Sequence, residues 1–258
     1  MPLTDTPTDL WIRRFGPAPG APPGVRLICF PHAGGSASFY HPLHRALGDA
    51  AEVLGVQYPG RQERRAEPPP ADLGVLVEGV RAELEEWGDR PYVFFGHSMG
   101  AVVAYELARR LERETGAGPL GLIASGRRAP GVLVEETVHL RDDHGLVDEV
   151  RALSGTAGSL LDDAEVRAMI LPSLRADYTA VETYRHTPGP ELACPVAVMT
   201  GDGDPRVTAD HARAWSHHTT GAFTLRTFPG GHFYLGDQWP AVGTAVRACL
   251  AAFGAGPR

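Results

Sequence analysis

The 258-residue chain is predicted to fold as an α/β protein, with a mostly parallel sheet covered by helices on both faces. Three observations indicate this class. Short apolar runs alternate with helical patterns, 43% hydrophobic residues supply a large core, and a Gly-His-Ser-Met-Gly sequence joins an apolar run to a helical one. Strands that are separated by helices favour a parallel sheet whose two faces are both buried.

The expected elements follow one another along a single domain, residues 1–258. The apolar runs that predict strands are 26–30, 52–58, 92–95, 120–125, 195–200 and 223–228. The patterns that predict helices of the main fold are 38–48, 72–87, 101–114, 207–218 and 238–253.

The first apolar run, Leu27–Phe30, leads directly into the loop Pro31-His-Ala-Gly-Gly-Ser36. In folds of this kind, a loop after an early strand supplies one amide of an oxyanion hole, and the residue after a nucleophile supplies the other. The expected donors are therefore the backbone N–H groups of Ala33 and Met99, both aimed at the oxygen that becomes negative during acyl transfer. His32 either shapes this hole or is a satisfied structural histidine, and we favour the structural role.

The Gly-His-Ser-Met-Gly sequence at 96–100 follows the third strand-like run and opens the third helical pattern. This context predicts a nucleophile elbow, a strained turn that lifts the Ser98 hydroxyl clear of the sheet. Gly96 and Gly100 leave room where side chains would collide with the strand or the helix. The alternative is a glycine-rich turn whose serine only caps the helix.

An insertion over 127–190 interrupts the alternation, because it contains helical patterns but no strong strand signal. The helical stretches are Asp142–Leu153, Asp162–Ile170 and Leu174–Tyr184. Lying between two core strands, this segment is expected to cover the strand ends near Ser98 as a helical lid that walls the pocket and excludes water. A helical decoration without a gating role is the alternative.

The last two strand-like runs each end in a glycine-rich loop that carries a polar residue. The first continues into Gly-Asp-Gly-Asp at 201–204, and the second into Pro-Gly-Gly-His at 229–232. The order serine, acid, histidine is that of hydrolases built around an elbow, so His232 is the expected general base and Asp204 its orienting carboxylate. Asp204 is preferred over Asp202, which lies nearer the strand and is typical of a turn residue.

Composition excludes several function classes. A net charge of −7 argues against nucleic-acid binding, and neither a signal peptide nor a membrane-spanning run is evident, so a cytoplasmic protein without a membrane partner is expected. All 24 basic residues are arginines, which excludes a lysine nucleophile. The three cysteines and eleven histidines lack metal-ligand spacing, so we expect no metal and no cofactor. A monomer is the default expectation.

Together these segments resemble the type II thioesterases, the discrete editing enzymes that accompany modular polyketide synthases and nonribosomal peptide synthetases. The resemblance covers nearly the whole chain and implies the α/β-hydrolase fold, with Ser98, Asp204 and His232 as the triad and Ala33 and Met99 as amide donors. The motifs that carry it are Phe30-Pro-His-Ala-Gly-Gly-Ser36, Gln57-Tyr-Pro-Gly-Arg61, Gly96-His-Ser-Met-Gly100, Ala104-Tyr-Glu-Leu-Ala-Arg109, Ser125-Gly-Arg-Arg-Ala-Pro130, Leu171-Pro-Ser-Leu-Arg-Ala-Asp177, Gly201-Asp-Gly-Asp204 and Pro229-Gly-Gly-His-Phe233.

The resemblance implies hydrolysis of an aberrant or stalled acyl thioester from the phosphopantetheine arm of an acyl or peptidyl carrier protein, through an acyl-serine intermediate. A small acyl chain would occupy the pocket, and the phosphopantetheine belongs to the partner. Carrier proteins of this kind are usually acidic, so docking would need a local basic face. The two possible clusters are Arg61, Arg64 and Arg65, or Arg127 and Arg128. Ordinary surface ion pairs are the alternative for both clusters.

Three other functions compete with this interpretation. The same acyl-enzyme could pass its acyl group to an alcohol or amine, as in a product-releasing thioesterase or acyltransferase. A general cytosolic esterase would use the same residues on simple esters. A non-catalytic binding module on the same fold usually lacks a triad member, and none is missing here.

Overall fold

The computed structural model describes residues 11–15, 24–154 and 162–254. Within these residues one sheet has the strand order β1-β3-β2-β4-β5-β6-β7. The strands are β1 (Ile12–Arg14), β2 (Arg26–Phe30), β3 (Glu52–Val56), β4 (Tyr92–His97), β5 (Leu122–Ser125), β6 (Val196–Gly201) and β7 (Phe223–Phe228). Only β1 runs antiparallel to its neighbour, so the prediction of a mostly parallel sheet is confirmed.

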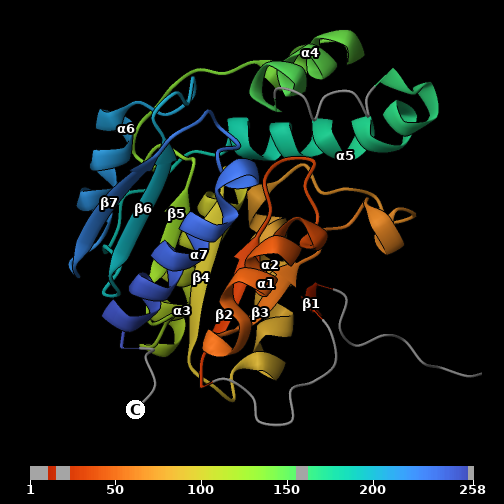
Figure 1. Cartoon of the computed structure of the whole chain (residues 1–258). Coiled ribbons are helices and arrows are strands. Elements are labelled where there is room, and N and C mark those ends of the chain that lie inside the picture. Colours follow the sequence, from red (N-terminus) through yellow and green to blue (C-terminus); the bar gives the residue numbers. More distant parts are fainter. Residues whose placement is uncertain (1–10, 16–23, 155–161, 255–258) are drawn as a thin grey trace, which may run out of the picture.

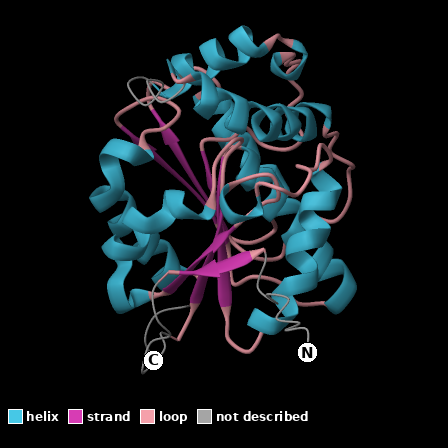
Figure 2. Cartoon of the chain, turned by 90° about the vertical axis from the view of Figure 1, so that its right-hand side faces the viewer, coloured by secondary structure: helices cyan, strands magenta, loops and turns pink. Residues whose placement is uncertain are grey.

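Helices cover both faces of this sheet (Figures 1 and 2). They are α1 (His41–Leu47), α2 (Leu73–Leu84), α3 (Met99–Thr115), α4 (Asp143–Ser154), α5 (Ala164–Thr183), α6 (Ala209–Arg213) and α7 (Leu235–Ala252). Helices α1 and α7 pack on one face and share a core with β2 and β3, whereas α2 and α3 form a second core on the opposite face. No helix among the described residues is long and apolar enough to span a membrane.

Strand β1 was not predicted. It has only three residues, too few to show a strand periodicity, and it lies at the edge of the sheet beside β3. A carboxylate from helix α2 holds it in place: Glu83 accepts hydrogen bonds from the backbone N–H groups of Trp11 at 2.6 Å and Ile12 at 2.8 Å. This contact spans about seventy residues of sequence and is therefore invisible to local patterns.

The insertion forms a separate layer above the carboxyl ends of the strands, where α4 and α5 lie (Figure 1). It has a small apolar core of its own, made of Val138, Leu146, Val147, Leu171 and Leu174. Ala33, in the loop after β2, packs against this core, so the inserted layer contacts the main fold beside the predicted oxyanion loop. Of the predicted range 127–190, residues 155–161 lie outside the described part of the chain.

The prediction of two helices over 162–170 and 174–184 is wrong, because the structure has the single helix α5 with Pro172 inside it. A proline removes one backbone donor and usually breaks a helix. Here Leu171 and Leu174, on either side of it, are buried in the same apolar cluster. Tertiary packing of one continuous apolar face therefore outweighs the local cost of the proline.

Candidate active site

The sharp turn between β4 and α3 has the geometry of a nucleophile elbow. Ser98 has φ 53° and ψ −118°, a backbone conformation that costs free energy in any residue other than glycine. The neighbouring glycines are required by space: a Cβ on Gly96 would lie 2.3 Å from the carbonyl oxygen of Gly100, and one on Gly100 would lie 2.0 Å from that of Phe30. The helix and two strands therefore meet too closely for any side chain at either position.

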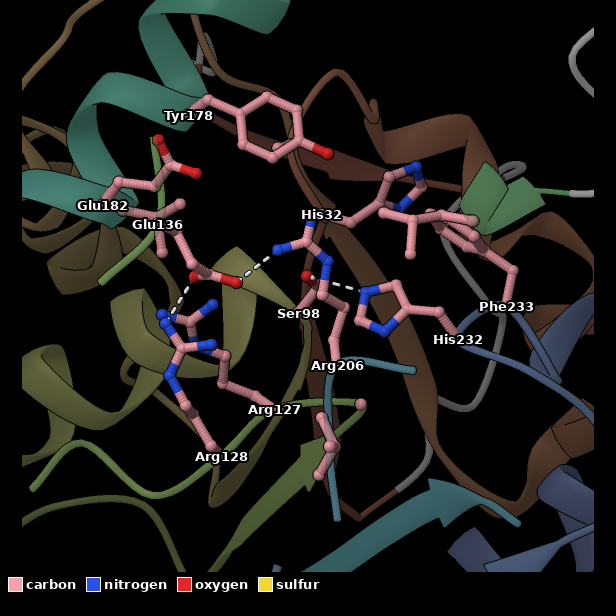
Figure 3. A pocket seen from close by; sticks show the side chains of 15 residues that line it. His32, Ser98, Arg127, Arg128, Glu136, Tyr178, Glu182, Arg206, His232 and Phe233 are labelled. Carbon is pink, nitrogen blue, oxygen red and sulfur yellow. Dashed lines mark hydrogen bonds and ion pairs between the residues drawn. The ribbon is translucent and has the colours of Figure 1, made fainter. Parts of the chain in front are cut away.

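Three polar side chains from separate strand ends form one hydrogen-bonded chain, and Figure 3 shows the contact between two of them, Ser98 and His232. His232 Nε2 lies 3.0 Å from Ser98 Oγ, and His232 Nδ1 lies 2.9 Å from Asp204 Oδ2. The side chain of Asp204 is fully buried, and its second oxygen accepts the backbone N–H of Arg206 at 2.8 Å. Because an ionised carboxylate only accepts hydrogen bonds, it fixes the Nδ1–H tautomer and leaves Nε2 free to accept the serine proton.

Asp202 makes a different contact from Asp204. Its Oδ1 accepts the backbone N–H of Gly230 at 2.9 Å, and the residue is exposed. It thereby ties the loop after β6 to the loop after β7, which carries the histidine. The structure thus places Asp204, and not Asp202, against His232.

The two predicted amide donors flank the serine. Ala33 follows β2 and lines the same cavity as Ser98 and His232, while Met99 is the first residue of the 17-residue helix α3. Among the described residues, neither backbone N–H donates to a protein acceptor. The N-terminal end of a helix also favours negative charge. Both N–H groups are thus without an acceptor among the described residues, which the predicted oxyanion role requires.

A buried ion pair holds the loop that carries Ala33, and sequence analysis did not assign it to the site. The guanidinium of Arg61 binds both carboxylate oxygens of Asp177, at 2.7 and 2.9 Å, and the two side chains are 6% and 0% exposed. Asp177 also accepts the N–H of Gly34 at 2.7 Å, and Arg61 donates to the carbonyl oxygen of Gly35 at 3.0 Å. Two of the recognised motifs, Pro-Gly-Arg and Leu-Arg-Ala-Asp, thus join α5 to the oxyanion loop.

The same burial corrects the prediction of two basic docking clusters. Arg61, Arg64 and Arg128 are buried, and each pairs with a carboxylate of the same chain. They therefore stabilise the interior instead of presenting charge to a partner. Of the first cluster only Arg65 is exposed, and Arg127 of the second lines the cavity around Ser98.

A chain of ion pairs forms one wall of this cavity, whose volume is about 40 Å³ (Figure 3). Glu136 pairs with Arg128 and Arg206, and Arg206 also pairs with Glu149 of α4. Burial alone would raise the pKa of Glu136, but hydrogen bonding to Arg128 and the nearby guanidinium charges lower it to about 2. Since Arg206 follows Asp204 by two residues, the wall connects the loop of the predicted catalytic acid to the inserted layer.

Two further histidines near the site are held neutral. Burial lowers the pKa of His97 well below its ordinary value, and its Nδ1 lies 2.9 Å from the hydroxyl of Ser125. Burial also lowers the pKa of His32 to about 3, and its ring packs edge-on against Phe39 and Phe233. The ring contacts agree with a structural role for His32, but its buried Nδ1 has no hydrogen-bond partner among the described residues, so it is not the satisfied histidine that was expected.

The neutral state of His97 predicts a pH dependence of stability. In the unfolded chain a histidine binds a proton below about pH 6.5, whereas the folded His97 does not, so stability is lost as the pH falls below that value. Between pH 7 and pH 5 the loss from one such group is about 2 kcal/mol. A His97→Asn variant should therefore lose about 2 kcal/mol less than the parent over this interval, as measured by urea unfolding. Equal losses in the two proteins would contradict the neutral assignment.

Fold and geometry together define an α/β-hydrolase with a serine, a histidine and a carboxylate at the carboxyl edge of its sheet. The model of the thioesterase domain family matches residues 25–250. The chain therefore belongs to the thioesterase family, and its relatives identify it further as a type II thioesterase. Among the described residues, no group of three or more histidine, cysteine or carboxylate side chains is arranged to hold a metal ion.

Three relatives illustrate the similarity. The chain is 52% identical to a probable cadicidin biosynthesis thioesterase of Streptomyces griseus, over 93% of this chain and 66% of that protein. It is 49% identical to the thioesterase PikA5 of Streptomyces venezuelae, over 92% of this chain and 85% of that protein. The solved structure of BorB, a type II thioesterase from the borrelidin biosynthetic cluster, superposes with a TM-score of 0.87 at 49% identity, covering 94% of this chain and 98% of BorB.

Proposed function

We propose that this enzyme hydrolyses aberrant or stalled acyl thioesters from the phosphopantetheine arm of carrier proteins, working as a monomer in the cytoplasm beside a polyketide synthase or a nonribosomal peptide synthetase. The observation that carries the proposal is the hydrogen-bonded chain from Ser98 through His232 to the buried Asp204. The type II thioesterase BorB, with its similar fold, supports the choice of substrate class.

In the first half of the reaction, Ser98 Oγ attacks the thioester carbonyl while His232 Nε2 takes the hydroxyl proton. Asp204 stabilises the imidazolium, and the backbone amides of Ala33 and Met99 donate to the tetrahedral oxyanion. The intermediate collapses as the carbon–sulfur bond breaks, and the pantetheine sulfur leaves with the proton from His232. The acyl group is then an ester on Ser98.

In the second half, water attacks the acyl-serine ester and His232 accepts the proton of that water. The second tetrahedral intermediate returns the proton to Ser98 Oγ and releases the free acid. The proposal requires no metal and no cofactor, since the phosphopantetheine belongs to the carrier protein. Helices α4 and α5 act as a lid that limits access of bulk water to the acyl-enzyme.

The size of the cavity favours editing over release of a finished product. The space around Ser98 is about 40 Å³ and is lined on one side by charged side chains, so it suits a small acyl group. The alternatives, transfer to an alcohol or amine and hydrolysis of simple esters, use the same residues and differ in acceptor and substrate.

The test is to incubate the enzyme with carrier proteins loaded with short acyl groups, in the presence and absence of alcohols and amines, and to identify products by mass spectrometry. We expect free acid as the product under all conditions, and a higher kcat/KM for the acyl carrier protein than for the matching p-nitrophenyl ester. Accumulation of an ester or amide would instead support acyl transfer. A higher kcat/KM for the simple ester would support a general esterase.

A further inference from the structure

Arg127 differs from the buried arginines of the described chain in having no carboxylate partner among the described residues. Five arginines are buried, and each of them forms an ion pair with a carboxylate: Arg26, Arg61, Arg64, Arg109 and Arg128. Arg127 is half-buried, yet its guanidinium forms no hydrogen bond and no ion pair with any residue that the structure describes. A guanidinium carries five donors, and none of those of Arg127 has an acceptor among the described residues, so they are available to a group that enters the cavity.

The carboxylates near Arg127 are already engaged. Glu136 is bound by Arg128 and Arg206, while Glu182 accepts from the backbone N–H groups of Val138 and His139 and contacts the His139 ring. Burial lowers the pKa of Arg127 to about 10, and the charge of Arg128 acts in the same direction. The group nevertheless stays charged at neutral pH, with donors unused.

Arg127 lies where two cavities adjoin. It lines the small cavity around Ser98, where its side chain is seen in Figure 3, and it also lines a second cavity of about 340 Å³. Val181 likewise lines both cavities. The walls of the second cavity include the apolar side chains Val102, Pro130, Val132, Leu133 and Val134. Charged side chains, among them Glu135 and Arg185, line the rest of it. A chain attached to Ser98 and passing Arg127 would thus enter a larger space with both apolar and charged walls.

We propose that the acyl chain of the substrate extends from Ser98 past Arg127 into the second cavity, and that Arg127 donates hydrogen bonds to an oxygen on that chain. The preferred substrates are accordingly acyl groups that carry a carbonyl, hydroxyl or carboxylate oxygen beyond the thioester carbonyl. A guanidinium suits such oxygens because it offers several donors in one plane and keeps its charge. The inference rests on the proposed function, and it adds the chemical class of acyl group.

The experiment compares acyl groups of equal length with and without the added oxygen. Hexanoyl, 3-oxohexanoyl, 5-oxohexanoyl and adipoyl thioesters of N-acetylcysteamine are hydrolysed by the parent enzyme and by Arg127→Met, Arg127→Lys and Arg65→Met variants. We expect the parent to prefer at least one oxygenated group over hexanoyl by about tenfold in kcat/KM, the effect of one charge-assisted hydrogen bond. Arg127→Met should abolish this preference, so that its kcat/KM for the oxygenated groups falls to that for hexanoyl, because the lost donors contact the added oxygen.

The Arg127→Lys and Arg65→Met variants separate hydrogen bonding by Arg127 from the effects of its charge and of removing any arginine. Arg127→Lys keeps the charge but loses the planar set of donors, so it should retain only part of the preference. Arg65→Met removes an exposed arginine and should behave as the parent. Arg127→Met should also unfold at the same temperature as the parent or a higher one, since no partner is left unpaired.

Distinct outcomes would overturn the inference and the proposed function. If the parent hydrolyses hexanoyl thioester but shows no preference for any oxygenated group, or if Arg127→Met keeps the preference, the role of Arg127 is wrong while thioester hydrolysis stands. If the parent hydrolyses none of these thioesters and no acyl carrier protein either, the proposed function itself fails.

Discussion

Thioester hydrolysis by a Ser98→Ala variant is expected to fall by about 10⁶-fold in kcat, the loss found when the nucleophile of a serine triad is removed. His232 would then have no hydroxyl to deprotonate, and no acyl-enzyme could form. The free energy of unfolding should change little, because the described contact of the Ser98 side chain is the hydrogen bond to His232 and alanine keeps the backbone of the turn. The measurements are kcat on an acyl carrier protein and the intact mass of the enzyme after brief exposure to substrate.

A matched control is Ser38→Ala, which removes a hydroxyl that bonds Ser36 and Gln62 near the surface, and which should leave kcat within about twofold. The parent should show the added mass of one acyl group when it is trapped early in the reaction, and Ser98→Ala should not. Residual activity above about 1% in the Ser98→Ala variant would exclude Ser98 as the nucleophile.

Breaking the buried ion pair of the oxyanion loop is expected to have the largest effect on stability. An Asp177→Ala variant leaves Arg61 charged and enclosed without its carboxylate, which typically costs about 3–5 kcal/mol in the free energy of unfolding. The same change removes the acceptor for the N–H of Gly34, so the adjacent amide of Ala33 loses its fixed position. Because one misplaced oxyanion donor costs about 10²-fold or more, kcat should fall together with stability.

A double variant separates these two consequences. Arg61→Met with Asp177→Leu replaces the pair by apolar side chains, which is often neutral or stabilising in a protein interior. We expect stability to recover and kcat to stay low, because neither side chain can bond the loop at Gly34 or Gly35. Urea unfolding and kcat on one thioester measure the two quantities. Full recovery of kcat would show that the ion pair serves stability alone.

The exposed pair Arg213 and Asp210 provides the control for this series. It joins side chains that are 64% and 92% exposed, three residues apart in the sequence. Pairs of this kind contribute about 0–1 kcal/mol, so Asp210→Ala should have little effect on unfolding or on kcat. A loss comparable to that of Asp177→Ala would indicate that burial is not the cause.

Local sequence patterns predicted the six parallel strands and most helices well, because apolar periodicity and glycine-rich turns are short-range signals. These patterns gave wrong predictions where a contact between distant residues decides whether a strand or a helix forms. Strand β1 depends on Glu83, and helix α5 continues through Pro172 because both of its halves pack into one apolar cluster. The prediction of basic docking clusters was wrong for a related reason, because the sequence does not show which arginines are buried in ion pairs.

The sequence by itself determined the fold class, the elbow at Ser98, and the loops that carry Asp204 and His232, because each follows the end of a parallel strand and such ends share one edge of the sheet. Tertiary structure alone decided that Arg61 and Asp177 hold the oxyanion loop and that Arg127 lines two cavities without a partner among the described residues. Both facts depend on which distant segments meet and exclude water. Ion pairing in the interior is set by that desolvation, which local sequence does not encode.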